Sequence, residues 1–223
     1  MQETKQVALD GPAGAGKSSV AKKLAQRLGY IYIDTGAMYR AVAWLILQKG
    51  LSLSDEDALD KLLKEVHITF GPVEEDGRQQ VFCNGQDCTE AIRSAEVSNF
   101  VSAVSALAPV RKVLVEKQRE IAAGNNVVMD GRDIGTVVLP QAQYKFFLTA
   151  SLQERARRRM LELTAKGQTV DIQTLQAEIA ARDKKDSERE LAPLAQASDA
   201  ILIDTSDLTF AQVVDKLFEL IIK

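Results

Sequence analysis

The chain has 223 residues, of which 46% are hydrophobic and 26% charged, and its formal net charge is −3. A chain of this length buries roughly 70% of its unfolded surface, so we expect one substantial core with appended pieces. The slightly acidic balance disfavours a dedicated nucleic-acid-binding protein. No apolar run approaches the roughly 18 residues of a membrane-spanning helix. The first residues, Met-Gln-Glu-Thr-Lys-Gln, lack signal-peptide character, so a cytoplasmic protein is expected.

The segment from Val7 to Ser18 joins a short apolar run to the pattern G-x-x-x-x-G-K-S, and a helix is expected over 19–28. Glycine lets such a loop turn its backbone N–H groups toward an anion, and a helix N-terminus adds partial positive charge. This context predicts a nucleotide phosphate site rather than an incidental glycine-rich turn. Lys17 is expected to reach the β- and γ-phosphates, and the Ser18 hydroxyl to ligate Mg²⁺. The loop comprises Gly11, Pro12, Ala13, Gly14, Ala15, Gly16, Lys17, Ser18 and Ser19.

Short apolar runs alternate with helical segments along the chain, which predicts an α/β fold with a parallel sheet. The runs lie at 7–10, 30–34, 127–130, 144–149 and 200–204. Four of them end in an aspartate followed by a turn sequence. Open α/β sheets bind ligands at the carboxyl ends of their strands, so we expect the site at that edge. A last helix near 209–222 has the hydrophobic spacing of a buried face.

Residues 66–88 interrupt this alternation and predict a small antiparallel sheet. A turn region is expected at 71–77 and a two-residue hairpin turn at Asn84-Gly85. In that hairpin Cys83 faces Gln86 and Cys88 faces Val81. The two thiols are then too far apart for an unstrained disulfide. With His67 as the chain's one histidine, a four-ligand zinc site is not expected either.

Residues 151–190 predict two charged helices without a strand between them. The first begins with the capping box Ser151-Leu152-Gln153-Glu154 and ends near Gly167. The second runs from near Asp171 to before Pro193.

Arginines crowd both of these helices. On the first, Arg155, Arg158 and Arg159 share a face and Arg157 lies beside them; on the second, Arg182, Asp186 and Arg189 share a face. A solvated charged surface is one interpretation. Beside a phosphate loop we favour a lid that closes over ATP and excludes water. Arginines placed around a migrating phosphoryl group are worth about 10³–10⁵ in rate.

Two polar clusters follow strands and so belong to the same sheet edge as the phosphate loop. They are D-T-G-A-M-Y-R at 34–40 and D-G-R-D-I-G-T at 130–136. Each offers an arginine to a phosphate, and a carboxylate or hydroxyl for hydrogen bonding. Other interpretations remain: Asp34 as a helix N-cap, Asp130 as the residue that orders the water shell of Mg²⁺, and Arg132-Asp133 as a surface ion pair.

Together these motifs resemble those of the bacterial cytidylate kinases, in the nucleoside monophosphate kinase group, over essentially the whole chain. The resemblance also rests on Glu90-Ala91-Ile92-Arg93, Val101-Ser102, Val110-Arg111 and R-D-K-K-D-S-E-R at 182–189. It implies transfer of the γ-phosphoryl group of ATP to CMP or dCMP, with Mg²⁺, in pyrimidine metabolism. It also implies a P-loop three-layer α/β sandwich with a five-stranded parallel sheet, a small antiparallel insert in the acceptor region and a helical lid.

We expect a single kinase domain over residues 1–223. Its core is assigned to 1–35, 95–150 and 191–223, its acceptor-binding region with the insert to 36–94, and its lid to 151–190. We expect a monomer whose partners are the small nucleotides ATP, CMP and dCMP, with neither nucleic acid nor membrane among them.

The resemblance also implies roles for individual residues. Ser102, Arg111 and Asp133 match positions that recognise cytosine, and Asp186 matches the residue that contacts the sugar. The implied acceptor set is Thr35, Tyr39, Arg40, Ser102, Arg111, Arg132, Asp133, Asp186 and Arg189. The implied catalytic set is Lys17, Arg132, Arg155, Arg158, Arg182 and Arg189, with Arg157 beside the donor. Thr35 departs from the family, which commonly has serine there.

Cytosine presents an amino donor and a ring acceptor where uracil presents the reverse. A carboxylate such as Asp133 and an arginine such as Arg111 therefore favour CMP over UMP. Three alternatives remain. They are a kinase of another small acceptor (UMP, AMP or shikimate), a nucleotide-switch GTPase, and a nucleic-acid-dependent ATPase. The GTPase is disfavoured because no Asn-Lys pair occurs in the chain to begin an N-K-x-D motif.

Overall fold

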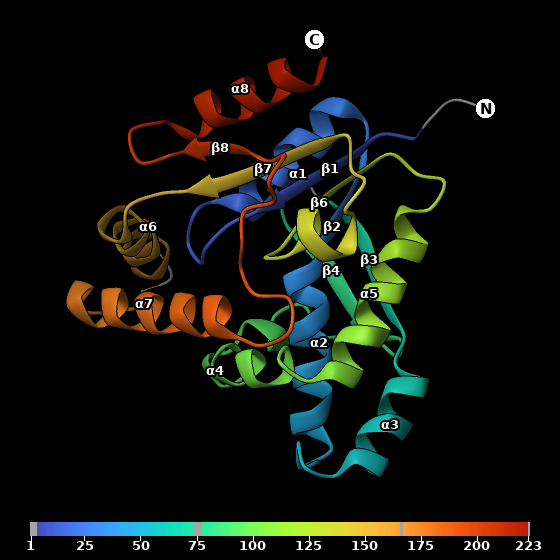
Figure 1. Cartoon of the computed structure of the whole chain (residues 1–223). Helices are drawn as coiled ribbons and strands as arrows, with labels where there is room; N and C mark the ends of the chain where they lie inside the picture. Colours follow the sequence, from blue (N-terminus) through green and yellow to red (C-terminus); the bar gives the residue numbers. More distant parts are fainter. Residues whose placement is uncertain (1–3, 74–76, 166, 223) are drawn as a thin grey trace. The chain divides into compact units, whose positions relative to one another are not determined.

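A computed structural model describes residues 4–73, 77–165 and 167–222 (Figure 1). The chain forms two compact units. One consists of Met1–Ile33 with Gly124–Lys223, and the other of Asp34–Ala123. Among the described residues, none of the helices is long and apolar enough to cross a membrane.

The first unit is built on a five-stranded parallel sheet with the strand order β2-β6-β1-β7-β8, which confirms the predicted α/β class. All five predicted strands are present. Leu9 lies opposite both Asp130 and Phe146, so three strands end at one edge. The strands are β1 (Gln6–Asp10), β2 (Ile31–Asp34), β6 (Val127–Asp130), β7 (Tyr144–Thr149) and β8 (Ile201–Asp204).

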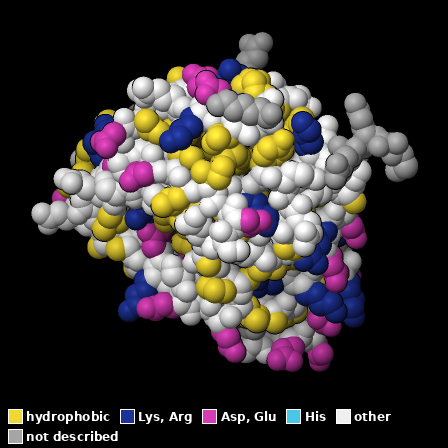
Figure 2. All heavy atoms as spheres, turned by 45° about the horizontal axis from the view of Figure 1, so that its top comes forward, with side chains coloured by type: hydrophobic (Ala, Val, Ile, Leu, Met, Phe, Trp, Pro, Cys, Tyr) yellow, Lys and Arg dark blue, Asp and Glu magenta, His cyan; other side chains and the backbone are white. Residues whose placement is uncertain are grey.

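Two pairs of helices accompany this sheet. Helix α1 (Lys17–Leu28) packs against the sheet's β6 and against α8 (Phe210–Ile222). The predicted apolar face of α8 is buried at Val213, Val214, Leu217 and Ile221, whereas Phe210 is half exposed. Helices α6 (Leu152–Ala165) and α7 (Ile172–Glu188), which the sequence predicts as a lid, pack on each other. They have a small core of their own, formed by Ala156, Leu175 and Ile179. On the face shown in Figure 2, acidic and basic side chains are interspersed with hydrophobic ones.

The predicted capping box at the start of α6 is half correct. The Ser151 hydroxyl accepts the Glu154 N–H at 3.2 Å, as an N-cap does. The other half of the prediction, a bond from the Ser151 N–H to the Glu154 carboxylate, is wrong. The Ser151 N–H donates instead to the Ser206 hydroxyl at 3.0 Å. The Glu154 carboxylate instead binds the guanidinium groups of Arg157 and Arg158, which are stronger donors than a neutral amide.

The second unit is organised around α2 (Thr35–Gln48). It also contains α3 (Glu56–Glu65), the antiparallel sheet β3-β4-β5, a short turn η1 (Ala91–Arg93), α4 (Ala95–Val104) and α5 (Ala108–Ala122). Helices α4 and α5 belong here, although the sequence analysis assigned them to the core. The reason is that α4 packs along α2, while α5 contacts α2 and α3.

The antiparallel insert is present as predicted, in strands β3 (Ile68–Val73), β4 (Gln79–Cys83) and β5 (Gln86–Asp87). Cys83 lies opposite Gln86, and Cys88 donates its N–H to Val81. Both thiols are buried and unlinked. The turn region predicted at 71–77 is wrong at its start, because β3 continues to Val73 with a register irregularity after Phe70. Residues 74–76 of that region lie outside the described part.

Gly11 shows why the phosphate loop begins with glycine. Its φ is +144°, and a Cβ there would lie 1.9 Å from the Leu148 carbonyl oxygen of β7. Backbone cannot yield as a side chain can. We therefore expect Gly11→Ala to lower the free energy of unfolding by about 3 kcal/mol or more, or to prevent folding. Thermal unfolding followed by circular dichroism measures this.

Gly29→Ala is the matched control, since Gly29 also has a positive φ (+70°) but a Cβ there would meet nothing within 4 Å. It is expected to cost only about 1 kcal/mol. Equal losses in the two variants would contradict the steric explanation.

Candidate active site

The phosphate loop connects β1 to α1 in the predicted strand–loop–helix arrangement. Gly14 and Gly16 have φ of +76° and +82°, conformations that other residues rarely adopt. Helix α1 begins directly at Lys17, and no side chain among the described residues caps it. Its first N–H groups are therefore directed into the loop, as in an anion site. The Lys17 ammonium is buried and donates to the Pro12 carbonyl at 2.7 Å.

Ser18 and Asp130 form the pair of oxygen groups that Mg²⁺ would require. The Ser18 hydroxyl donates to Asp130 Oδ2 at 2.8 Å, and the Tyr32 hydroxyl donates to Asp130 Oδ1 at 2.7 Å. Mg²⁺ usually takes one or two protein oxygens and completes its shell with waters and phosphates, so these residues fit it. Elsewhere in the described chain, no cluster of three or more His, Cys, Asp or Glu side chains could hold a metal ion.

Positive charge is concentrated around Lys17. Burial lowers the pKa of Lys17 well below its usual value, and the charges of Arg132 and Arg182 lower it further. The carboxylates of Asp130 and Asp10 act in the opposite direction. Cations held this close repel one another, and a bound polyanion relieves that repulsion.

Arg132 and Asp133 each pair with a residue near the end of α7, so the interpretation as a surface ion pair is wrong. Arg132 Nε donates to Asp186 Oδ2 at 2.8 Å, and Arg189 contacts Asp133 Oδ1 at 3.4 Å. The Asp133 and Asp186 side chains are less than 10% exposed. Arg189 also donates to the Ala192 carbonyl at 2.6 Å, which fixes its guanidinium just after α7.

The loop that carries Arg132 and Asp133 is held by Asp10, a residue that the sequence analysis did not single out. Asp10 accepts the N–H groups of Ile134 and Gly135 at 2.8 and 2.7 Å. These residues begin a π-helical turn, η2 (Ile134–Val138). Burial raises the pKa of Asp10 to about 6, although both of these N–H groups lower it.

Arg155 anchors the lid to the phosphate loop. Its guanidinium donates to the carbonyls of Ala13 and Ala150 at 2.9 and 3.0 Å and pairs with Asp183 of α7. Asp183 also accepts the Ala13 N–H at 3.1 Å. The backbone of Ala13 is thus held by α6 at its carbonyl and by α7 at its N–H. Asp183 was not predicted, although it directly follows Arg182 in the motif.

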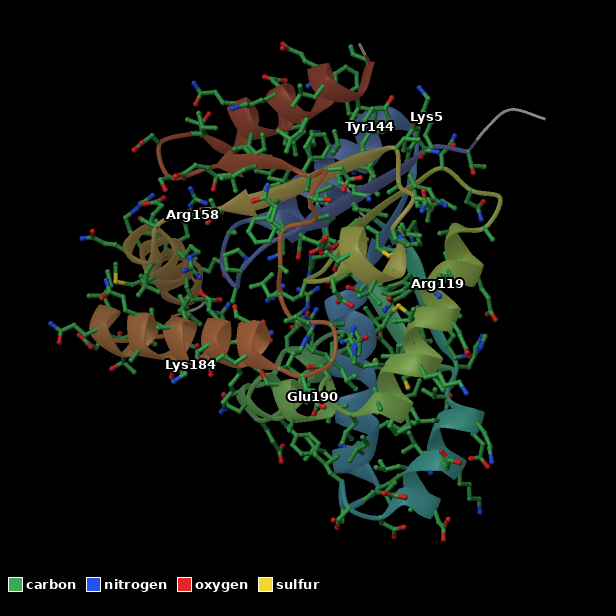
Figure 3. All side chains as sticks on the ribbon, viewed as in Figure 1. Lys5, Arg119, Tyr144, Arg158, Lys184 and Glu190 are labelled. Atoms are coloured by element: carbon green, nitrogen blue, oxygen red, sulfur yellow. The ribbon has the colours of Figure 1, made fainter. Side chains whose placement is uncertain are left out.

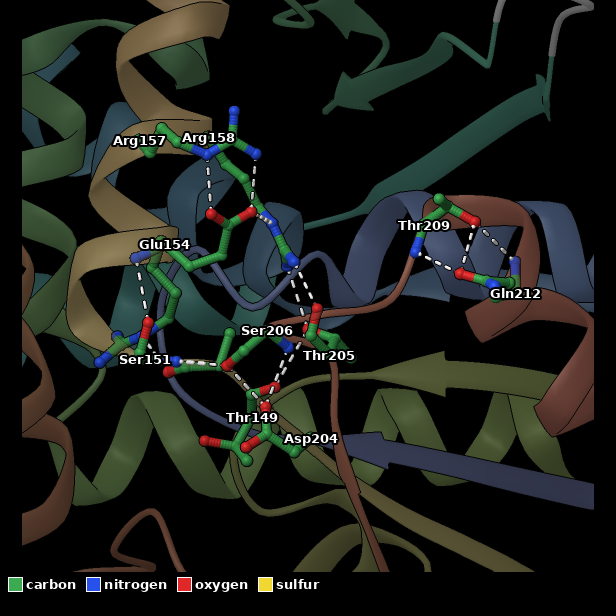
Figure 4. Close-up of polar contacts among 12 residues, drawn as sticks. Thr149, Ser151, Glu154, Arg157, Arg158, Asp204, Thr205, Ser206, Thr209 and Gln212 are labelled. Carbon is green, nitrogen blue, oxygen red and sulfur yellow. Dashed lines mark hydrogen bonds and ion pairs between the residues drawn. The ribbon is translucent and has the colours of Figure 1, made fainter.

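Arg158 lies between the phosphate loop and the end of β8 (Figures 3 and 4). It donates to the Thr205 hydroxyl at 3.0 Å and to the Thr205 carbonyl at 2.6 Å. A Cβ on Gly16 would lie 3.8 Å from its terminal nitrogen. The remaining Nε donates to Glu154 at 2.9 Å.

Arg157 is half exposed and makes a two-pronged contact with Glu154, at 2.7 and 2.8 Å (Figure 4). This hydrogen bonding is the main reason that the pKa of Glu154 falls to about 2, and Arg158 adds to it. Arg159 is also half exposed and pairs with Glu162. Of the four arginines, Arg155 and Arg158 are therefore the two beside the loop.

In the second unit, Asp34 is the N-cap of α2, which was the alternative interpretation of this residue. Its carboxylate accepts the Ala37 N–H at 2.7 Å and pairs with Arg40 at 3.2 Å. Arg40 thus folds back over the first turn of the helix, where Thr35 is buried. Arg40 Nε is buried and has no hydrogen-bond partner among the described residues, so this donor remains available for an anion.

Tyr39, Ser102 and Arg111 are brought together around the corner between α4 and α5. Arg111 is buried in the first turn of α5 and donates to the Ser105 carbonyl at 3.3 Å. The Ser105 hydroxyl donates to the Ser102 carbonyl at 3.1 Å. The Arg111 guanidinium carbon lies 5.6 Å from the centre of the Tyr39 ring, within cation–π range.

Comparison with known proteins gives one consistent result. The family model described as cytidylate kinase matches residues 7–223. A cytidylate kinase from Leuconostoc mesenteroides is 53% identical over 97% of this chain and 96% of its own length. One from Caldanaerobacter subterraneus is 54% identical, over 99% and 96%. Among solved structures, a shikimate kinase from Bacteroides thetaiotaomicron is similar in fold, with a TM-score of 0.50, 15% identity and coverage of 99% and 100%.

Proposed function

Because the chain belongs to the cytidylate kinase family, we propose that it transfers the γ-phosphoryl group of ATP to CMP or dCMP, yielding CDP or dCDP for pyrimidine nucleotide metabolism. The observation that carries this proposal is the cluster of cations around the phosphate loop. Arg132 and Arg182 are close enough to Lys17 to lower its pKa in addition to burial. The negative charge of a transferring phosphoryl group would stabilise all three cations.

On the donor side, the loop from Gly11 to Ser19 binds the ATP phosphates through its N–H groups and Lys17. Ser18 and Asp130 hold Mg²⁺, directly or through its waters; when bound, the ion neutralises charge on the β- and γ-phosphates. Arg155 holds the loop to the lid, and Arg158 is directed along the loop beside Gly16. Arg157, assigned to the donor, would have to leave Glu154 on the outer side of α6 to contact it.

Around the transferred group, Arg132, Arg182 and Arg189 stabilise the developing charge. No strong general base is required, because an acceptor phosphate oxygen is already anionic. Positioning and electrostatic stabilisation therefore account for the rate. The contacts of Arg132 with Asp186 and of Arg189 with Asp133 support this assignment, since they fix both guanidinium groups before substrate arrives.

For the acceptor, we assign the phosphate to Arg40, Arg132 and the first turn of α2 at Thr35, and the base to Ser102, Arg111 and Asp133. Tyr39 packs on the acceptor, and Asp186 binds the sugar hydroxyl. The unused Nε of Arg40 and the Tyr39–Arg111 contact support the first two assignments. One hydrogen bond from the 2′-hydroxyl is worth about 0.5–1.5 kcal/mol, so dCMP is expected to react only several-fold more slowly than CMP.

We further propose that both units form a single kinase domain that acts as a monomer in the cytoplasm on small nucleotides, without nucleic acid. The predicted lid is kept as part of this proposal, whereas α4 and α5 are assigned to the acceptor-binding region with the rest of the second unit.

A coupled ADP-release assay with ATP and a panel of acceptors tests the function. Rapid turnover is expected with CMP and dCMP, and little with UMP, AMP or shikimate. Strong turnover with UMP or AMP alone would overturn the cytosine assignment. Hydrolysis that nucleic acid stimulates without any acceptor would favour an ATPase instead.

A further inference from the structure

Tyr32 contacts the proposed Mg²⁺ site and lies just before the D-T-G-A-M-Y-R segment at 34–40. It lies on β2, with its side chain almost completely buried, and its hydroxyl donates to Asp130 Oδ1. The other carboxylate oxygen of Asp130 accepts the Ser18 hydroxyl. We infer that Tyr32 is a positioning residue, which holds the Asp130 carboxylate so that Oδ2 faces Ser18 and the metal. This inference rests on the proposed function of the loop.

The need for such a residue follows from the chemistry of aspartate. The Asp130 backbone is fixed, because β6 lies between β2 and β1 in the sheet and Asp130 lies opposite Leu9 of β1. Its carboxylate is not fixed in the same way, since the terminal torsion of aspartate is broad and roughly two-fold. The Ser18 hydroxyl contacts only one of the two oxygens, Oδ2. A second bond, at 2.7 Å from a buried hydroxyl, holds both oxygens in place.

Tyrosine suits this task because its ring is rigid and is held by its surroundings. The hydroxyl lies at the end of a planar ring with only two torsions, so little side-chain freedom remains to be lost. The Lys22 ammonium of α1 lies 5.7 Å from the ring centre, on the helix that also carries Ser18. Phenylalanine would fill the same space, so Tyr32→Phe deletes the hydroxyl that donates to Asp130 and keeps the ring.

The test is ATP binding by calorimetry, once with excess MgCl₂ and once with EDTA, in the wild type and in Tyr32→Phe. The ratio of ATP affinity with Mg²⁺ to ATP affinity with EDTA is expected to be about 3- to 10-fold smaller in the variant. This is the change in affinity that the loss of one hydrogen bond produces. The affinity in EDTA is expected to stay within about two-fold. Tyr30→Phe, two residues away, makes the same chemical deletion and is expected to leave both affinities unchanged.

Kinetics supply a second readout. The Mg²⁺ concentration for half-maximal rate is expected to rise in Tyr32→Phe, while KM for CMP stays unchanged. An unchanged Mg²⁺ gain would overturn the inference, and so would an equal loss of affinity with Mg²⁺ and with EDTA, because the hydroxyl would then support only the loop. Failure of the wild type to phosphorylate CMP would instead reject the proposed function.

Discussion

Arg189→Ala is expected to lower kcat with CMP by about 10³-fold or more, while the protein stays folded. Arg189 lies just after α7, with its side chain only 8% exposed, and is fixed by Asp133 and the Ala192 carbonyl. A guanidinium held in this way loses little orientational freedom when charge develops on the transferred group. Removing Arg189 is therefore expected to lose most of the electrostatic stabilisation that its guanidinium gives the transition state.

Steady-state kinetics and circular dichroism together measure this prediction. Arg189→Lys keeps the charge but loses the planar fork, so an intermediate rate is expected. Arg159→Ala removes a half-exposed arginine that pairs with Glu162 and is expected to leave kcat unchanged. A kcat near that of the wild type in Arg189→Ala would refute the role given to Arg189.

Arg111→Met is expected to reduce the preference for CMP over UMP by about 100-fold. Cytosine offers an acceptor where uracil offers a donor, and a charge-assisted hydrogen bond to it is worth roughly 1.5–3 kcal/mol. We propose the buried guanidinium of Arg111, which lies near the Tyr39 ring, as this donor. Methionine keeps the aliphatic length but makes no such bond, so kcat/KM should fall for CMP and change little for UMP.

The measurement compares kcat/KM for both acceptors. Lys112→Met is the control, because it removes an exposed positive charge from the next position of α5. It should leave the CMP-to-UMP ratio unchanged. Equal losses for CMP and UMP in Arg111→Met would show that the arginine supports the unit rather than reads the base.

Much of the fold was predictable because its signals are local. All five strands of the parallel sheet are short apolar runs, and four of them end in an aspartate before a turn. The G-x-x-x-x-G-K-S motif, between a strand and a helix, indicated the phosphate loop. The hairpin at Asn84-Gly85 followed from turn chemistry, with φ of +51° and +79°. Each of these features depends on residues within a few positions of one another.

The unpredicted parts of the site depend on distant partners. Asp10 binds Ile134, Tyr32 binds Asp130 and Asp183 binds Ala13 across 124, 98 and 170 positions of sequence. Nothing near these residues in the sequence indicates such a partner. The second bond of the predicted capping box is absent for a related reason. The Ser151 N–H donates to the Ser206 hydroxyl, which is 55 positions away in the sequence.

Helices α6 and α7 both bind Ala13, which determines which substitutions are tolerated at this position. Asp183 accepts the backbone N–H of residue 13 and Arg155 donates to its carbonyl, and neither bond involves the methyl group. Replacing Ala13 by another small residue is therefore expected to leave the attachment intact. Proline is the exception, since it has no N–H to give to Asp183. The attachment of α6 and α7 to the loop thus depends on the side chains of Arg155 and Asp183, whereas residue 13 contributes its backbone N–H and carbonyl.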